Sequence, residues 1–221
     1  MSPHQGAGLT SQKSRDRLVQ ALRGKGIRNE RVLAAIARVP RHLFVSEALS
    51  KRAYEDTALP IDAGQTISQP YIVARMTELV LAQENVSRVL EVGTGSGYQC
   101  AVLAELIDRV YSVERIKPLF KKAHRRLISE LGYRNIRLRY TDGTWGWTES
   151  APYDVILVTA APDEVPQVLL EQLADRGRLI IPVGEHKQTQ RLLLITRKGE
   201  RFHEQEIEKV QFVPMLKGQA I

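Results

Sequence analysis

The residues best placed to do chemistry gather around three closely spaced glycines. Gly93, Gly95 and Gly97 alternate with small hydroxyl residues and follow the apolar run 89–92. Glycines at this spacing make a tight turn in which a ligand can lie against bare backbone. From Gln99 onward the residues are helix formers with apolar spacing. A strand, a glycine turn and a helix in this order predict the nucleotide-cradling half of a doubly wound α/β fold.

The details of the turn narrow the class of ligand. A dinucleotide-binding turn has its third glycine one residue later, and a phosphate-binding loop of the Walker type needs a lysine that is absent here. Glu91 precedes Gly93 by two residues, where its carboxylate would repel a pyrophosphate. The same carboxylate suits a positively charged ligand such as S-adenosylmethionine, with its ammonium and sulfonium groups. A turn that only reverses the chain is the simpler alternative.

A second acid follows at the spacing expected for a ribose contact. Glu114 ends the apolar run 110–114 and lies 19 residues beyond Gly95 (114 − 95). In related nucleotide folds a carboxylate about 20 residues after the turn accepts hydrogen bonds from the ribose hydroxyls. An ordinary surface acid is the alternative.

A third acid and two tryptophans come after the predicted strand 135–140. The pair Asp142-Gly143 is typical of a turn, but at the carboxyl edge of a sheet Asp142 could accept the exocyclic amine of adenine. Trp145 and Trp147 could flank that base or pack inside the fold, and the sequence does not choose between the two.

Hydroxyl side chains stand at the entrance of the predicted helix 71–81. Pro70 excludes its predecessor from the helical region, so Thr66 and Ser68 lie where the chain enters the helix. They could cap the helix or face the ligand. No base with an orienting partner can be identified that would make Ser68 a nucleophile. Methyl transfer to an oxygen that is already anionic, such as a carboxylate, needs alignment and exclusion of water more than a strong base.

Hydrophobic periodicity supplies the elements that would position these residues. We expect one domain over residues 11–221, with a helical cap at 11–80 and a sheet core at 81–221, after a disordered stretch at 1–10. The predicted helices are 11–22, one capped by Asn29 and stopped by Pro40, a short one within 41–59, 71–81, 117–131 and 165–173. The predicted strands are 89–92, 110–114, 135–140, 153–161 at the centre, 178–183, and a final antiparallel hairpin that starts at residue 190.

Composition and charge limit the class of protein to which the chain can belong. With 43% hydrophobic and 26% charged residues the chain is typical of a soluble globular protein, and no apolar run approaches the roughly 18 residues of a membrane helix. The N-terminus lacks the features of a secretory signal, and Cys100 is a single cysteine that fits a reducing cytoplasm as a packing residue. The net charge of +7 could favour nucleic acid, but the basic residues are scattered. The histidines show no metal-ligand spacing.

Taken together, the motifs make the chain resemble the protein-L-isoaspartate O-methyltransferase family. The motifs appear in the order of the family and extend over nearly the whole chain from about residue 11. They are Val39-Pro-Arg-His-Leu-Phe-Val45, Gln65-Thr-Ile-Ser-Gln-Pro70, Val89 to Gly97, Val110 to Glu114, Asp142-Gly143, Ala160-Ala-Pro162, Gly177 to Gly184 and Val210-Gln-Phe-Val-Pro214. The segment Thr-Ile-Ser-Gln-Pro is specific to this family, whereas the glycine motif is shared with many methyltransferases.

The resemblance implies a cytoplasmic repair enzyme. It would esterify the free α-carboxylate of L-isoaspartyl residues, and of D-aspartyl residues in some members, with S-adenosyl-L-methionine as donor and S-adenosyl-L-homocysteine as product. The fold implied is a mostly parallel Rossmann-like α/β sheet with helices on both faces, and its last strands are swapped relative to most such enzymes. The expected partners are damaged proteins or peptides, with no nucleic acid, membrane or metal, and the protein is expected to be a monomer.

The resemblance also implies roles for individual residues. Ser68 would be the active-site hydroxyl, and Thr66, Ser68 and Val213 would contact the substrate, with Phe212 to Leu216 covering the site. The residues expected to bind the cofactor are Gln65, Thr66, Ile67, Ser68, Glu91, Gly93, Thr94, Gly95, Ser96, Gly97, Glu114, Arg115, Asp142 and Gly143.

Two other functions compete with this interpretation. A methyltransferase acting on RNA or a small molecule would fit the net charge, but the chain has no aromatic-rich basic stripe. A methyltransferase-like binding module without catalysis would tolerate loss of the cofactor acids, yet Glu91, Glu114 and Asp142 are all present.

Overall fold

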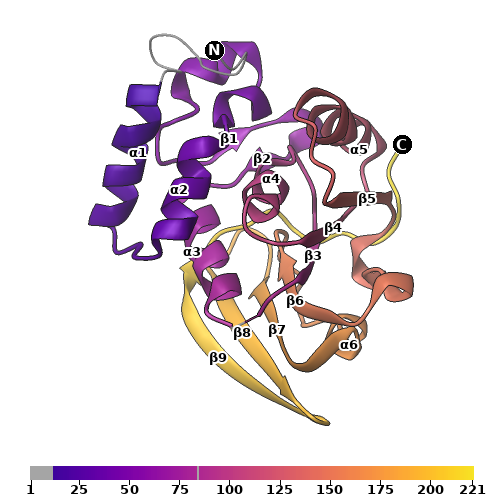
Figure 1. Cartoon of the computed structure of the whole chain (residues 1–221). Helices are drawn as coiled ribbons and strands as arrows, with labels where there is room; N and C mark the ends of the chain where they lie inside the picture. Colours follow the sequence, from indigo (N-terminus) through magenta and orange to yellow (C-terminus); the bar gives the residue numbers. More distant parts are fainter. Residues whose placement is uncertain (1–11, 84) are drawn as a thin grey trace.

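The computed structural model describes residues 12–83 and 85–221, and in this part of the chain a seven-stranded sheet forms the centre (Figure 1). The strand order is β5-β4-β3-β6-β7-β8-β9. The strands are β3 (Arg88–Val92), β4 (Arg109–Glu114), β5 (Ile136–Tyr140), β6 (Tyr153–Val158), β7 (Leu173–Val183), β8 (Gln190–Lys198) and β9 (Arg201–Val210). The first five are parallel, and the hairpin β8–β9 joins them antiparallel, so the predicted α/β sheet with an antiparallel edge and a central β6 is confirmed.

The helices follow the predicted order with shifts at their ends. They are α1 (Gln12–Gly24), α2 (Glu30–Arg38), α3 (Pro70–Leu81), α4 (Tyr98–Ala104), α5 (Lys117–His124) and α6 (Gln167–Glu171). Asn29 caps α2 as predicted, since its side chain accepts hydrogen bonds from two free amides of the first turn. The helix expected within 41–59 is two short 3₁₀ turns, Arg41–Phe44 and Glu47–Arg52, followed by the small pair β1 (Leu59–Pro60) and β2 (Thr66–Ile67). The predicted disorder at 1–10 lies outside the described residues.

The sheet separates two apolar cores. Alternate residues of a strand point to opposite faces. Val89 and Leu157 therefore pack in the core that contains α1 to α5, whereas Leu90 and Ile156 pack in the core that contains α6. All four side chains are fully buried. Burial on both faces explains why β3 and β6 are continuous apolar runs rather than alternating ones.

Two predicted elements end elsewhere than expected. The predicted helix 165–173 is shortened to Gln167–Glu171, because Leu173 already pairs with Tyr153 as the first residue of β7. The predicted strand 178–183 was therefore too short. Arg176 has a positive φ of 63°, a backbone conformation typical of turns, but it lies within β7. The pairing of β7 with β6 changes register in this region.

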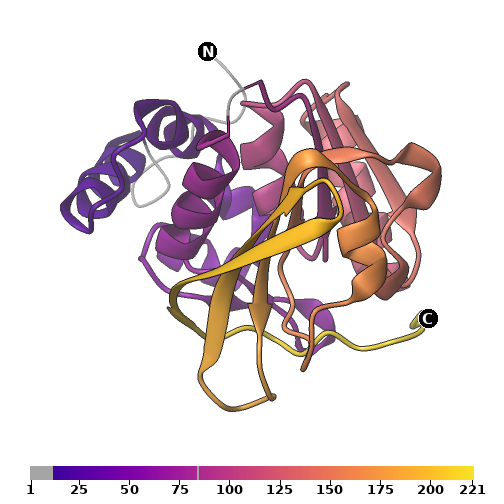
Figure 2. The same ribbon diagram turned by 90° about the horizontal axis from the view of Figure 1, so that it is seen from below.

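The C-terminal segment, residues 211–221, crosses the carboxyl edge of the parallel strands. Figures 1 and 2 show this yellow trace running from the end of β9 to the side of the molecule where α5 and β5 lie. The backbone of Val213 and Met215 pairs with Ala161 beyond β6, through two hydrogen bonds of 2.8 Å. Farther along, the carbonyl of Ala220 accepts from the amide of Lys117 at the start of α5. The segment thus closes the edge at which ligands of such sheets bind.

Candidate active site

A cleft, called the main cleft below, lies where the direction of strand addition reverses. From β3 the chain adds β4 on one side, whereas β6 lies on the other side of β3, and ligands of doubly wound sheets bind at the carboxyl ends of such strands. The cleft encloses about 860 Å³, counting its open mouth. Its walls include the β2–α3 junction, the glycine turn, the ends of β4 and β6, and residues 213–216 of the C-terminal segment.

The glycine turn is shaped by a close approach that only glycine permits. Gly93, Gly95 and Gly97 have φ values of 100°, 53° and 91°. A Cβ on Gly93 would lie 2.4 Å from the hydroxyl of Thr159, which donates to the carbonyls of Val92 and Gly93 at 3.1 and 2.7 Å. The end of β6 therefore packs directly on the turn and leaves the turn's backbone facing the cleft.

Glu91 is buried at the floor of the cleft in a hydroxyl network. Its side chain is 0% exposed, and Ser112 donates to Oε2 at 2.5 Å while sharing a second hydrogen bond with Thr94 at 2.6 Å. The other oxygen, Oε1, has no partner among the described residues. Burial raises the pKa of Glu91 from 4.5 to about 8, opposed most by the hydrogen bond from Ser112. An unpaired buried carboxyl oxygen is costly, so this atom fits a site for a cationic donor.

Glu114 links the end of β4 to the glycine turn. Its Oε2 accepts from the amide of Gly95 and its Oε1 from the amide of Ile116, both at 2.8 Å. The residue is 5% exposed, and burial raises its pKa in spite of these hydrogen bonds. Each carboxylate oxygen keeps acceptor capacity beyond one bond. Glu114 can therefore hold the turn and still accept ligand hydroxyls in the cleft that it lines.

The hydroxyls before α3 are not helix caps. The amide of Tyr71 in the first turn donates instead to the carboxylate of Asp56 at 2.8 Å, so the capping interpretation of Thr66 and Ser68 is wrong. Among the described residues neither hydroxyl has a hydrogen-bond partner, and both residues line the main cleft. Arg41 fixes the backbone there, because its guanidinium donates to the carbonyl of Ser68 at 2.8 Å. The side chain of Ser68 is thus presented to the cleft by a held backbone.

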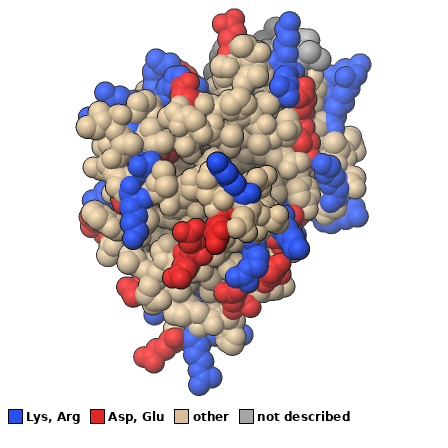
Figure 3. Space-filling view, turned by 180° about the vertical axis from the view of Figure 1, so that it is seen from behind, with Lys and Arg blue, Asp and Glu red and all other residues tan. Residues whose placement is uncertain are grey.

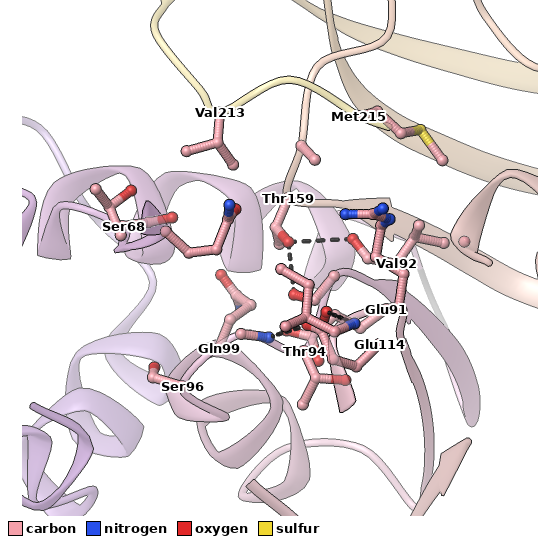
Figure 4. A pocket seen from close by; sticks show the side chains of 18 of the residues that line it. Ser68, Glu91, Val92, Thr94, Ser96, Gln99, Glu114, Thr159, Val213 and Met215 are labelled. Atoms are coloured by element: carbon pink, nitrogen blue, oxygen red, sulfur yellow. Dashed lines mark hydrogen bonds between the residues drawn. The ribbon is translucent and has the colours of Figure 1, made fainter. Parts of the chain in front are cut away.

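A second cleft opens beside the main one. The two clefts share Thr66, Ser68, Thr159 and Val213. In the view of Figure 4, Ser68 lies on the opposite side from Glu91 and Glu114, with Thr159 between them and Val213 above. The second cleft continues over the loop 187–189 and residues 209–213. This arrangement suits two ligands that meet at the shared residues, one in each cleft.

Most of the predicted site residues come together here. Those that line the main cleft are Gln65, Thr66, Ile67, Ser68, Glu91, Gly93, Thr94, Gly95, Ser96, Glu114, Arg115, Gly143 and Val213. Gly97 does not line it: an added Cβ would lie 3.1 Å from a methyl of Leu127, in the π-helical turn Arg125–Glu130 that continues α5.

Asp142 also lies outside the lining of the main cleft. Its Oδ1 accepts from the amide and the hydroxyl of Thr144, and its Oδ2 accepts from the amide of Gly218. Burial alone would raise the pKa of Asp142, but these hydrogen bonds outweigh burial and lower it. Asp142 therefore ties the C-terminal segment to the sheet, and a contact with adenine would have to use the remaining acceptor capacity of its carboxylate.

Several lining residues were missed in the sequence. Thr159 and Gln99 both line the cleft. Nothing local in the sequence indicated that Thr159 would bond to the end of β3. Met215 also lines the cleft, and it lies within the segment Phe212 to Leu216 that the family resemblance implied would cover the site.

The two tryptophans stay outside the main cleft. Trp147 packs edge-on against Tyr111, with ring centroids 5.4 Å apart, and Trp145 is 67% exposed. In the part of the chain that is described, no cluster of three or more His, Cys, Asp or Glu side chains could hold a metal ion. Within the same residues no helix has the length and apolar character needed to cross a membrane.

Comparison with known sequences gives a consistent set of relatives. The family model described as protein-L-isoaspartate(D-aspartate) O-methyltransferase matches residues 13–220. The protein-L-isoaspartate O-methyltransferase of Halorhodospira halophila is 58% identical over 213 residues, which is 96% of each chain. The corresponding protein of Cellvibrio japonicus is 57% identical over 218 residues, 98% of this chain and 97% of that one.

Solved structures agree at the level of the whole fold. One protein-L-isoaspartate O-methyltransferase superposes with a TM-score of 0.83 at 31% identity, covering 93% of this chain and 67% of the other. A Plasmodium falciparum structure, assigned as a protein-L-isoaspartate O-methyltransferase and in complex with S-adenosyl-L-homocysteine, gives 0.78 at 28% identity, covering 91% and 97%.

Proposed function

This chain belongs to the protein-L-isoaspartate(D-aspartate) O-methyltransferase family, and on that premise we propose that it methylates the free α-carboxylate of L-isoaspartyl residues in damaged proteins and peptides. The methyl donor is S-adenosyl-L-methionine and the product is S-adenosyl-L-homocysteine. The observation that carries the assignment is the extent of the family match, because residues 13–220 include both clefts and every residue that they share. The methyl ester formed then collapses to a succinimide, which can reopen to normal aspartate.

The main cleft has features that fit the cofactor. The unpaired Oε1 of Glu91 suits its cationic methionine part, and the bare turn at Gly93 lets a ligand approach the backbone. Glu114 is the proposed ribose acceptor, and Asp142 with Gly143 the proposed adenine contact. The full proposed set is Gln65, Thr66, Ile67, Ser68, Glu91, Gly93, Thr94, Gly95, Ser96, Gly97, Glu114, Arg115, Asp142 and Gly143.

The reaction requires alignment more than acid–base chemistry. The bound cofactor supplies a methyl group activated by a positively charged sulfur. A carboxylate oxygen of the substrate forms the new bond to the methyl carbon as the carbon–sulfur bond breaks, the electron pair stays on sulfur, and no proton moves. Ser68 is the proposed catalytic residue: its unpartnered hydroxyl would donate to the substrate carboxylate and orient it. Thr66 and Val213 would hold the substrate, and residues 212–216 would exclude water.

The remaining proposals concern partners and cell compartment. We propose a monomer in the cytoplasm that acts on proteins and peptides and not on nucleic acid or membranes, built as one domain over 11–221. On the face in Figure 3 the Lys and Arg side chains are interspersed with Asp and Glu. A nucleic-acid acceptor would call for a basic stripe or patch. The single cysteine, Cys100, is free and buried, as in proteins of reducing compartments.

One experiment tests the proposed function directly. Two peptides that differ only in an aspartyl or isoaspartyl linkage are incubated with methyl-labelled S-adenosylmethionine. Base-labile label on the isoaspartyl peptide alone is expected. Label on neither peptide, with cofactor binding intact by calorimetry, would refute the proposed substrate. Ser68→Ala should lower turnover more than it lowers cofactor affinity, and equal turnover would remove Ser68 from the reaction.

A further inference from the structure

The second cleft can hold the parts of a polypeptide substrate that lie next to its reacting residue. It meets the main cleft at Ser68. From there it is lined by Thr57 and Ala58 of the cap, by the loop 187–189 between β7 and β8, and by residues 209–213 at the end of β9 and beyond it. A peptide with its damaged residue at Ser68 would therefore place neighbouring residues against this surface. Side chains of the second cleft can therefore contact the substrate residues that flank the isoaspartyl residue.

The charge of this cleft has one sign. Within the described residues, Lys187 and Lys209 are its charged lining side chains, both are exposed, and neither forms an ion pair. The acids closest to these lysines in sequence do not line the cleft. Glu208 pairs with Arg75 at 3.3 Å, and Glu185 accepts a hydrogen bond from the neutral side chain of Gln188.

The β8–β9 register places no acidic side chain directly opposite Lys209. Lys209 lies directly opposite Arg191, and side chains opposite each other in an antiparallel pair lie on the same face. The guanidinium of Arg191 forms ion pairs with the carboxylates of Glu204 and Glu206, at N–O distances of 3.5 and 3.9 Å, farther along the hairpin. The end of the hairpin nearest the cleft therefore keeps the uncompensated charge of Lys209.

We propose that Lys187 and Lys209 select isoaspartyl substrates that carry acidic side chains close to the damaged residue. The inference rests on the proposed function and adds to it a preferred substrate class, acid-flanked isoaspartyl segments. Each lysine would pair with a flanking Asp or Glu carboxylate at the rim of the second cleft. Exposed pairs of this kind are weak, so each lysine should change the apparent affinity by about two- to five-fold.

The test uses three isoaspartyl peptides that differ only at the residues flanking the damage, where they carry Glu, Gln or Lys. The wild-type enzyme should show its lowest KM for the Glu peptide and its highest for the Lys peptide, with similar kcat values. Lys187→Gln and Lys209→Gln should each reduce the ratio of KM between the Gln and Glu peptides, and the double variant should bring it close to one. Lys198→Gln, at the far end of the hairpin, is the matched control and should leave the ratio unchanged.

The possible outcomes separate this inference from the proposed function. Salt from about 0.05 M to about 0.5 M should shrink the wild-type ratio, because screening weakens exposed charge pairs. Methylation of all three peptides with equal KM, or a KM ratio between the Gln and Glu peptides that persists in the double variant, would overturn the proposal that the two lysines select acidic substrates. Failure to methylate any isoaspartyl peptide would overturn the proposed function, and this inference with it.

Discussion

The buried carboxyl of Glu91 makes a quantitative prediction about stability. Its pKa is about 8 in the folded chain and 4.5 as an unperturbed group. Between these values the folded state holds a proton that the unfolded state has released, so the free energy of unfolding falls as pH rises. One proton corresponds to about 1.4 kcal/mol per pH unit. The contribution of Glu91 is fully present below about pH 4.5 and is lost as pH rises through about 8, a total on the order of 5 kcal/mol.

The substitution that isolates this effect is Glu91→Gln. Glutamine has the shape of the protonated acid, keeps an acceptor for the hydroxyl of Ser112, and does not titrate. Without cofactor, wild type and variant should have similar stability at pH 5. The variant should become progressively more stable than wild type up to about pH 8, after which the difference should level off.

The measurement is urea denaturation of both proteins at closely spaced pH values from 5 to 9, followed by far-UV circular dichroism. Other titrating groups contribute to both curves, so only the difference between them reports Glu91. Two parallel curves would refute the reasoning, because they would mean that Glu91 is ionised in the folded chain. A variant that loses stability as pH rises, relative to wild type, would have the wrong sign.

Cofactor binding should favour the ionised form of Glu91 over the protonated form. A cationic ligand favours the carboxylate, so binding near pH 7 should release a proton from Glu91. Calorimetry in buffers of different ionisation enthalpy measures that proton. Glu91→Gln should bind S-adenosylmethionine more weakly than wild type at pH 8 and release fewer protons. Equal affinity would argue against pairing between Glu91 and the positive charge of the cofactor.

Three other substitutions test the frame of the site. Gly93→Ala should abolish cofactor binding, measured by calorimetry, because the added Cβ would clash with the hydroxyl of Thr159. Gly132→Ala, also at positive φ but with open space around it, should cost only about 1–2 kcal/mol of stability in denaturation. Similar results for the two variants in both measurements would contradict the clash. Glu114→Gln should weaken cofactor binding about ten-fold or more by calorimetry, and unchanged affinity would remove the ribose contact. Asp56→Ala should cost about 1–2 kcal/mol in urea denaturation as α3 loses its cap, and a loss no larger than that of the exposed Asp16→Ala would argue against the cap.

Sequence alone was sufficient where the signal is local. The glycine turn was predicted from residues 93–97, because a buried strand, a tight turn and a helix each leave a pattern within a few residues. The same is true of Asn29, whose side chain bonds amides two and three residues away. The hairpin β8–β9 was visible for the same reason.

Sequence failed where the partner is distant. The cap of α3 comes from Asp56, fifteen residues before the amide that it binds, so Ser68 could not be distinguished from a cap beforehand. Thr159 joins the site through bonds to Val92 and Gly93, more than sixty residues earlier. The packing of Trp147 on Tyr111 is another contact that only the folded sheet creates.

The C-terminal segment also has a consequence for the order of synthesis. Residues 211–221 are made after every strand of the sheet, yet they supply Val213 and Met215 to the cleft and bond to the ends of β4 and β6. Domains begin to fold from the N-terminus while the chain is still growing. The sheet can therefore pair on the ribosome before the cleft has its last wall. A ligand that binds only the finished cleft would stabilise, by mass action, chains that already include this segment and leave shorter nascent chains untouched.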